Sequence, residues 1–218
     1  MKIKETALFI LVTFIFSSFT PGTALGEDFW DNSLKAVPVL VVLPPDFNDY
    51  HWTILERYFT DLDAEMEVAA LRTDTMGAAT NPRVRVTPTI RLDEVNPRDY
   101  EIVAFVGGPG LEDYVAAPLF TDVARGAVGA GKFVAGVENV AALFAYAGIV
   151  EDRRITGSKS AKSAVEAAGG KFIHKARMFA DGPVVTGNKE VAIKRVARKV
   201  IRLYLGIKSG GSRAVTSK

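Results

Sequence analysis

The sequence predicts an α/β fold in which helices cover both faces of a doubly wound, mostly parallel sheet. Short runs of consecutive apolar residues alternate along the chain with amphipathic segments of helical length. All-apolar runs are typical of parallel strands, because such strands are buried on both faces. Their alternation with amphipathic segments indicates repeated strand–helix–strand units. The chain is long enough to bury one core, so we expect a single main domain.

The first half of this domain begins with a strand and a crossover helix. Residues 37–43 are apolar and end at Pro44, and Pro38 is acceptable because it lies at the start of the strand. Residues 49–62 carry apolar side chains at helical spacing, and residues 66–71 predict the second strand. After them we expect, in order, a loop (76–81), short extended pieces (84–86 and 89–90), a helical turn (92–95), a strand (102–106) and a helix (111–130).

The next segment predicts a strand, a sharp turn and a helix. Residues 133–137 are apolar, Glu138 and Asn139 form the turn, and a helix from Val140 ends near Gly148. This is the layout of a nucleophile elbow, which presents one side chain at the end of a strand. The C-terminal third predicts extended pieces (154–157, 171–173, 178–180 and 184–186), a helix (161–168) and a long helix (190–205) whose basic residues we expect to face solvent.

The N-terminal residues are typical of a secretory signal peptide. Lys2 and Lys4 precede an apolar run over residues 7–16, and the small residues Ala24 and Gly26 fit a cleavage site. We therefore expect an exported, periplasmic protein. The alternative is a membrane anchor formed by an uncleaved N-terminal segment. The expected parts of the chain are a signal peptide (1–26), a leader (27–36), the domain (37–206) and a disordered tail (207–218).

Composition narrows the chemistry of the chain. Its 218 residues carry a formal net charge of +2, which gives no reason to expect a nucleic-acid partner. The sequence contains no cysteine, so thiolate nucleophiles, thiolate metal ligands and thiol redox chemistry are excluded. It contains two histidines, too few for an ordinary zinc site unless carboxylates such as Asp49 contribute. We expect neither a metal nor a cofactor, and no membrane partner once the signal peptide is removed.

Five strings carry a more specific signal. They are VPVLVVLPPDF, LDEVNPRDYEIVAFVGGPG, GKFVAGVENVAALFAYAG, DRRITG and DGPVVTGN, the last of which ends at residue 188. In their order and spacing they resemble the ThiJ/PfpI family of the class I glutamine amidotransferase-like superfamily. The resemblance implies a flavodoxin-like sandwich with a site at the carboxyl ends of the central strands. It also implies a homo-oligomer, since members of the family commonly form dimers.

The same resemblance implies which residues stand at the family's site. The family carries a cysteine at the elbow, commonly followed by a histidine, and a glutamate after the first strand. These positions correspond here to Glu138, Asn139 and His51. Cysteine-dependent protease, amidase, deglycase or glyoxalase activity is therefore not expected. We expect a pseudoenzyme that serves as a ligand-binding or protein-interaction module.

The candidate site admits two arrangements and two functions. His51 and Glu138 could hydrogen-bond across the pocket, because a buried carboxylate is costly when unpaired. Alternatively, Glu138 accepts backbone N–H bonds at its helix start while His51 faces solvent. The alternative function is a non-thiol hydrolase or lyase that uses Glu138 and His51, although a carboxylate at the elbow would oppose an oxyanion.

The candidate ligand-binding residues are Gly107, Gly108, Gly110, Glu138 and Asn139, with a small molecule as the expected partner. Glycines at this point also permit a tight strand-to-helix turn with no ligand bound. An open polar pocket beside Glu138 would favour binding or catalysis. A pocket filled by Tyr50, Trp52 or Tyr114 would favour a structural role.

Overall fold

The computed structural model describes residues 33–213, with side chains described through residue 206. The predicted signal peptide and most of the leader lie outside the described residues, as do residues 214–218. In the described part of the chain, no helix combines the length and the apolar character needed to cross a membrane.

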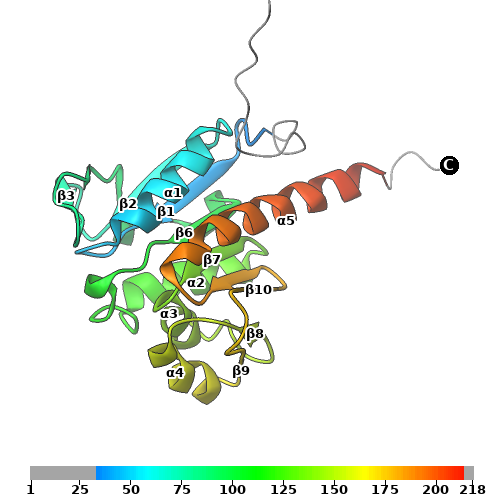
Figure 1. The fold of residues 1–218 in the computed structure, drawn as a ribbon. Helices are drawn as coiled ribbons and strands as arrows, with labels where there is room; N and C mark the ends of the chain where they lie inside the picture. Colours follow the sequence, from blue (N-terminus) through cyan, green and yellow to red (C-terminus); the bar gives the residue numbers. More distant parts are fainter. Residues whose placement is uncertain (1–32, 214–218) are drawn as a thin grey trace, which may run out of the picture. The chain divides into compact units, whose positions relative to one another are not determined.

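A seven-stranded sheet forms the centre of the domain (Figure 1). Its strands, in spatial order, are β10 (Met178–Asp181), β11 (Val184–Gly187), β7 (Phe133–Val137), β6 (Ile102–Phe105), β1 (Pro38–Val42), β2 (Glu65–Ala70) and β5 (Ile90–Arg91). Neighbouring strands are parallel except β10 and β11, which pair antiparallel. The prediction of a mostly parallel sheet is confirmed. Every residue of β6, β7 and β11 is buried, as expected for strands covered on both faces.

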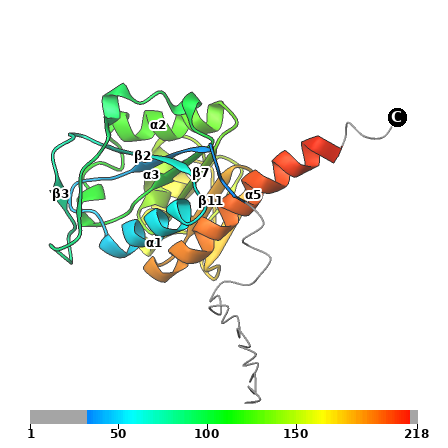
Figure 2. The same ribbon diagram turned by 90° about the horizontal axis from the view of Figure 1, so that it is seen from above.

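Helices lie on both faces of the sheet, as the sequence predicted (Figure 2). One face carries α1 (Asp49–Thr60) and α5 (Ile193–Arg213), which pack against each other. The other face carries α2 (Pro118–Gly129) and α3 (Val140–Tyr146), and α4 (Lys162–Ala167) packs on α3. The short elements are β3 (Met76–Gly77), β4 (Arg85–Val86), β8 (Arg154–Ile155), β9 (Lys171–Phe172) and the 3-10 turns η2 (Leu92–Glu94), η3 (Pro97–Asp99), η4 (Pro109–Leu111), η5 (Lys159–Ala161) and η6 (Glu190–Ala192).

Two expected elements differ from the structure. The segment 76–81, expected to be a loop, begins with β3, which pairs antiparallel with β4. The helix expected over residues 111–130 begins only at Pro118. Proline fits the first turn of a helix but disfavours the helical conformation in the residue before it, and Ala117 is extended, with ψ 129°. A pattern of apolar residues does not reveal this start.

The last helix also departs from expectation. It continues to Arg213, beyond residue 206, where we had placed the end of the domain. We expected its basic side chains to face solvent, but two of them contact α1. Arg198 Nε donates a hydrogen bond to Tyr58 Oη at 2.7 Å, and Lys194 Nζ lies 5.8 Å from the ring centroid of Tyr50. Both tyrosines belong to α1, so the basic side of α5 helps to fasten the two helices together.

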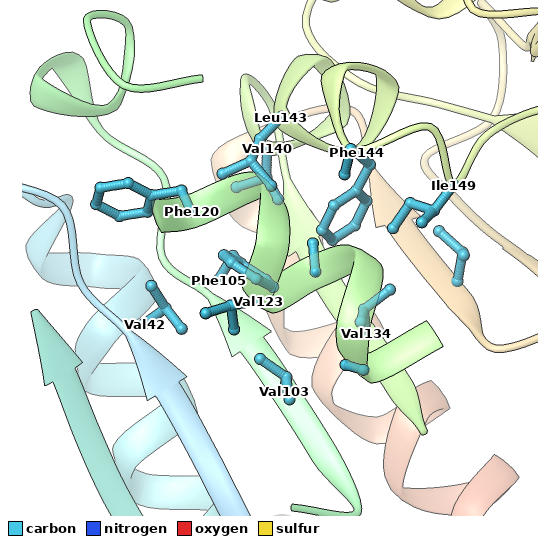
Figure 3. Close-up of a cluster of buried hydrophobic side chains, with 14 of the residues drawn as sticks. Val42, Val103, Phe105, Phe120, Val123, Val134, Val140, Leu143, Phe144 and Ile149 are labelled. Atoms are coloured by element: carbon cyan, nitrogen blue, oxygen red, sulfur yellow. The ribbon is translucent and has the colours of Figure 1, made fainter. Parts of the chain in front are cut away.

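A buried cluster holds α3 against the sheet (Figure 3). Phe144 of α3 meets Phe105 of β6 edge to face, with ring centroids 5.5 Å apart and an interplanar angle of 85°. Val140 and Leu143 are fully buried in the same cluster, beside Phe120 of α2. Each such side chain contributes about 1.5–3 kcal/mol through burial. Because both β7 and α3 are fixed in this way, the two-residue turn between them has a defined position.

Candidate functional site

Glu138 occupies the elbow between β7 and α3 in a conformation rare for its residue type. Its φ is 57°, in the left-handed region, where a side chain other than glycine is strained. Neighbouring segments hold it there: its N–H donates to Gly187 O at 2.8 Å, and its carbonyl accepts from Ser158 N–H at 3.1 Å. A Cβ on Gly157 would lie 2.9 Å from the same carbonyl, so the close approach of this segment requires glycine. Strain stored in this way is typical of functional turns.

His51 lies in the first turn of α1 and is completely buried. Asn48 caps this helix, because its Oδ1 accepts the His51 N–H at 2.9 Å. His51 Nε2 lies 3.7 Å from Glu138 Oε2, which is too long for a hydrogen bond. The structure thus brings the two residues together without the hydrogen bond that we had hypothesised. Among the described residues, neither imidazole nitrogen has a hydrogen-bond partner.

Burial sets the protonation of this pair. Desolvation lowers the pKa of His51 to about 4, against a smaller opposing effect of the Asp49 charge. Desolvation also raises the pKa of Glu138, the Glu190 backbone N–H lowers it, and the Glu190 charge raises it. The distance alone would suggest an ion pair, but a neutral imidazole carries no charge at pH 7. The contact is therefore between a neutral histidine and a carboxyl group without a cationic partner.

Asn139 ties the elbow to the loop after β6. Its Nδ2 donates to Gly108 O at 2.8 Å, while its Oδ1 is buried with no partner among the described residues. A Cβ on Gly107 would lie 2.9 Å from that Oδ1 and 3.3 Å from His51 Nδ1. The absence of a side chain at Gly107 therefore lets His51, Asn139 and the strand end pack together.

A cavity of about 290 Å³ opens beside Glu138 at the carboxyl ends of the strands. It is lined by Asn48, Gly108, Pro109, Glu112, Glu138, Asn139, Ser158 and Ser160. The lining contains two carboxyl groups and no Lys, Arg or His side chain from the described part of the chain. Tyr50, Trp52 and Tyr114 do not line it, so these aromatic side chains do not fill the cavity.

The structure distributes the predicted site residues over three places. Glu138, Asn139 and Gly108 line the cavity, whereas Gly107 lies beneath it against His51. Gly110 lies elsewhere: a Cβ there would be 1.9 Å from Pro45 O, which indicates a packing role.

Sequence reasoning missed several residues of the lining, namely Asn48, Glu112, Ser158 and Ser160. Asn48 could have been found as an N-cap residue, because asparagine precedes a predicted helix. The serines follow β8, a two-residue strand, and carry no recognisable motif. Glu190 was also missed, although its Oε1 accepts a hydrogen bond from Asn48 Nδ2 at 3.1 Å across 142 residues of sequence. Within residues 33–213 there is no group of three or more His, Asp or Glu residues placed to hold a metal ion.

The strand order, the elbow after β7 and the cavity at the strand ends define an α/β protein of the flavodoxin-like sandwich class. Residues 37–203 match the model of the DJ-1/PfpI family. The chain belongs to this family. No curated protein matches the sequence.

Solved structures support the fold. A ThiJ/PfpI domain protein from Brachyspira murdochii matches with a TM-score of 0.71 and 21% identity, covering 77% of this chain and 95% of that one. Drosophila melanogaster DJ-1beta matches with a TM-score of 0.70 and 17% identity over 84% of this chain and 100% of that one. A ThiJ/PfpI family protein from Pseudomonas syringae matches with a TM-score of 0.69 and 16% identity, covering 93% of this chain and 85% of that one. Identities this low establish a common fold. The chemistry of the site has to be argued from the residues of this chain.

Proposed function

We propose that this protein is a binding member of its family without thiol catalysis, and that the elbow cavity takes a small ligand bearing a cationic, hydrogen-bond-donating group. One observation carries the proposal: a carboxyl group, Glu138, stands at the elbow in a cavity lined by no described cation. The chain has no cysteine that could act there instead.

The electrostatics of the cavity favour a cation over an anion. Burial and the nearby Glu190 charge raise the pKa of Glu138, which means that its carboxylate is poorly solvated and lacks a counter-charge. Glu112 adds a second carboxyl group to the lining. An ammonium or guanidinium group would supply the missing charge and hydrogen-bond donors. An oxyanion formed during acyl transfer would meet repulsion at the same point.

Uncharged polar groups complete the lining. Ser158 Oγ and Ser160 Oγ lie 2.8 Å apart, and Asn139 is fixed by its bond to Gly108. His51 acts as a positioning residue: it packs beneath Glu138, and being neutral it leaves the carboxylate charge uncompensated. The ligand would then be oriented by the hydroxyl and amide groups and held by Glu138.

A non-thiol hydrolase or lyase is the second candidate. Its support is the raised pKa of Glu138, since a general base works best when its pKa approaches the working pH. Both nitrogens of His51 are buried, however, which keeps them from a substrate in the cavity. Hydrolysis of a simple ester that is lost in both Glu138→Gln and His51→Gln would favour this candidate over binding alone.

Calorimetric titration of the purified chain tests the binding proposal. Ethanolamine and guanidinium are the probes, and propan-1-ol is the neutral comparison. We expect saturable binding of a cation that weakens at least about tenfold in Glu138→Gln, since hydrogen bonds to a charged group contribute roughly 1.5–3 kcal/mol. Glu151→Gln, at an exposed position, is the matched control and should bind as the wild type does. Equal binding by both variants would refute the proposal.

We also propose that the protein is exported and works as a homo-oligomer. The pattern in residues 1–26 and the family's habit of dimerising support this. An intact mass starting after Gly26, measured on protein from the periplasmic fraction of a bacterial host, would test the first part. Light scattering of the mature protein would test the second, and a strict monomer would count against it.

A further inference from the structure

A second cavity, of about 500 Å³, is lined by four cationic side chains and by no carboxyl group of the described residues. We call it the basic pocket. Its lining consists of Lys175, Arg177, Asn188, Lys189, Val191, Ala192 and Arg195. These residues come from the segment before β10, the segment after β11 and the start of α5, which lie together at one end of the sheet (Figure 1).

The four cations of the basic pocket form no ion pairs with the described residues. No ion pair found among the described residues uses Lys175, Arg177, Lys189 or Arg195. The whole chain is nearly balanced, with 27 Lys and Arg against 25 Asp and Glu, so this concentration is local. Like charges that share a cavity repel one another, and a bound anion would relieve the repulsion.

The nearest carboxyl group in sequence is directed to the other site. Glu190 follows Lys189 in the chain, but its Oε1 accepts the hydrogen bond from Asn48 Nδ2, and its charge raises the pKa of Glu138. Glu190 therefore contacts a residue of the elbow cavity, while its neighbours Lys189 and Val191 line the basic pocket. The elbow cavity is acidic, and the basic pocket is cationic.

The backbone around the basic pocket is well fixed. Asn188 N–H donates to Arg177 O at 3.1 Å, which extends the pairing of Met178 with Gly187 by one step beyond the β10–β11 ladder. The long helix α5 begins beside the pocket, and its N-terminal end adds positive potential. Val191 is 65% exposed, so an apolar surface lies among the cations.

We propose that the basic pocket binds a small phosphorylated molecule carrying at least two negative charges. Two arginines can each hold phosphate oxygens through paired N–H donors, and two lysines add charge. The volume is within the usual range of ligand pockets, about 300–1,000 Å³. Val191 would contact an apolar part of the ligand. This site is separate from the elbow cavity, so the proposal stands or falls independently of the cationic ligand proposed there.

Titration of the full chain with pyrophosphate tests this inference. We expect one binding site per chain, with affinity that falls as salt is added. Arg177→Gln combined with Arg195→Gln should weaken binding at least about tenfold, because two charged contacts are lost. Both arginines are exposed, so the double variant should keep the wild-type melting temperature.

The control removes the same charge elsewhere. Arg83→Gln combined with Arg85→Gln changes two exposed arginines in and beside β4, outside the basic pocket. This variant should bind pyrophosphate within about twofold of the wild type if the site is local. Absence of saturable binding, or equal weakening in both double variants, would overturn the proposal.

An experiment with lipid vesicles distinguishes a phosphorylated lipid headgroup from a soluble phosphorylated ligand. Vesicles with and without a phosphoinositide bisphosphate are sedimented with the wild type and with both double variants. Sedimentation that needs Arg177 and Arg195 would assign the site to a lipid headgroup. Pyrophosphate binding with no sedimentation would assign it to a soluble ligand. If the protein neither binds pyrophosphate nor sediments with the vesicles, the inference is contradicted.

Discussion

Glu138 Oε2 and His51 Nε2 lie 3.7 Å apart, one on a side chain that is 35% exposed and the other on a side chain with no exposed surface. The difference in burial determines what the pair can do. The histidine stays neutral because its charged form is poorly solvated, whereas Glu138 reaches the cavity and can meet a ligand. Burial raises the pKa of Glu138, and its carboxylate, when ionised, opposes an oxyanion formed in the cavity.

Acid should destabilise the protein through His51. Its pKa is near 6.5 when unfolded and about 4 when folded, so the unfolded state binds the extra proton between these values. Stability from this group is complete above pH 6.5 and is lost as the pH falls toward 4. This lowers the free energy of unfolding by about 3 kcal/mol. Urea unfolding at a series of pH values should show a shallower pH dependence in His51→Gln, while His174→Gln, at the exposed histidine, should follow the wild type.

Glu138→Gln should stabilise the free protein at neutral and alkaline pH. The folded pKa of Glu138 is raised, so the stability it contributes is complete below the unfolded pKa and is lost as pH rises through the folded one. Glutamine keeps the size and the acceptor oxygen without the buried charge. The melting temperature of the variant should exceed that of the wild type at about pH 8, with the difference shrinking in acid. A variant that is less stable than the wild type both at about pH 8 and in acid would contradict this expectation.

Binding of ethanolamine should weaken in acid earlier than binding to an ordinary carboxylate would. The cation needs ionised Glu138, whose pKa burial raises. The affinity should therefore be constant in alkali and fall as pH drops through that raised value. Calorimetry in two buffers of different ionisation enthalpy would also detect the proton released on binding. An affinity independent of pH would mean that the ligand does not contact Glu138.

Gly107→Ala should destabilise the fold by about 1–3 kcal/mol through overpacking. The new Cβ would lie 2.9 Å from Asn139 Oδ1 and 3.3 Å from His51, so the elbow and α1 would have to separate. Gly129→Ala is the matched control, because a Cβ there meets nothing within 4 Å and the residue ends α2. Chemical unfolding should show a loss for the first variant and no loss for the second. Equal stability of the two would show that the packing at Gly107 is looser than described.

Much of the fold could be predicted from local sequence, because the strands and helices carry clear periodic patterns. The runs that became β1, β6 and β7 are buried on both faces and are therefore apolar throughout. The late start of α2 was missed, since the apolar pattern begins before Pro118. The pairing of β3 with β4 was missed because each has only two residues.

For the site, sequence located the elbow and the resemblance brought in His51. Neither the sequence pattern nor the resemblance located Ser158, Ser160 or Glu190, which lie far along the chain from the elbow. Arg195 is exposed, as expected for a solvated helix face, but its position in one pocket with Arg177 and two lysines could not be predicted from the sequence.

The sequence by itself determined the α/β class, the position of the elbow and the absence of thiol chemistry, because these depend on residue identity and on spacing within single segments. Only the tertiary structure decided that His51 is neutral, that it makes no hydrogen bond with Glu138, and that one cavity is lined by carboxyl groups and another by cationic side chains. The reason is physical: desolvation and charge separation depend on which distant segments meet, and a local pattern does not contain that information.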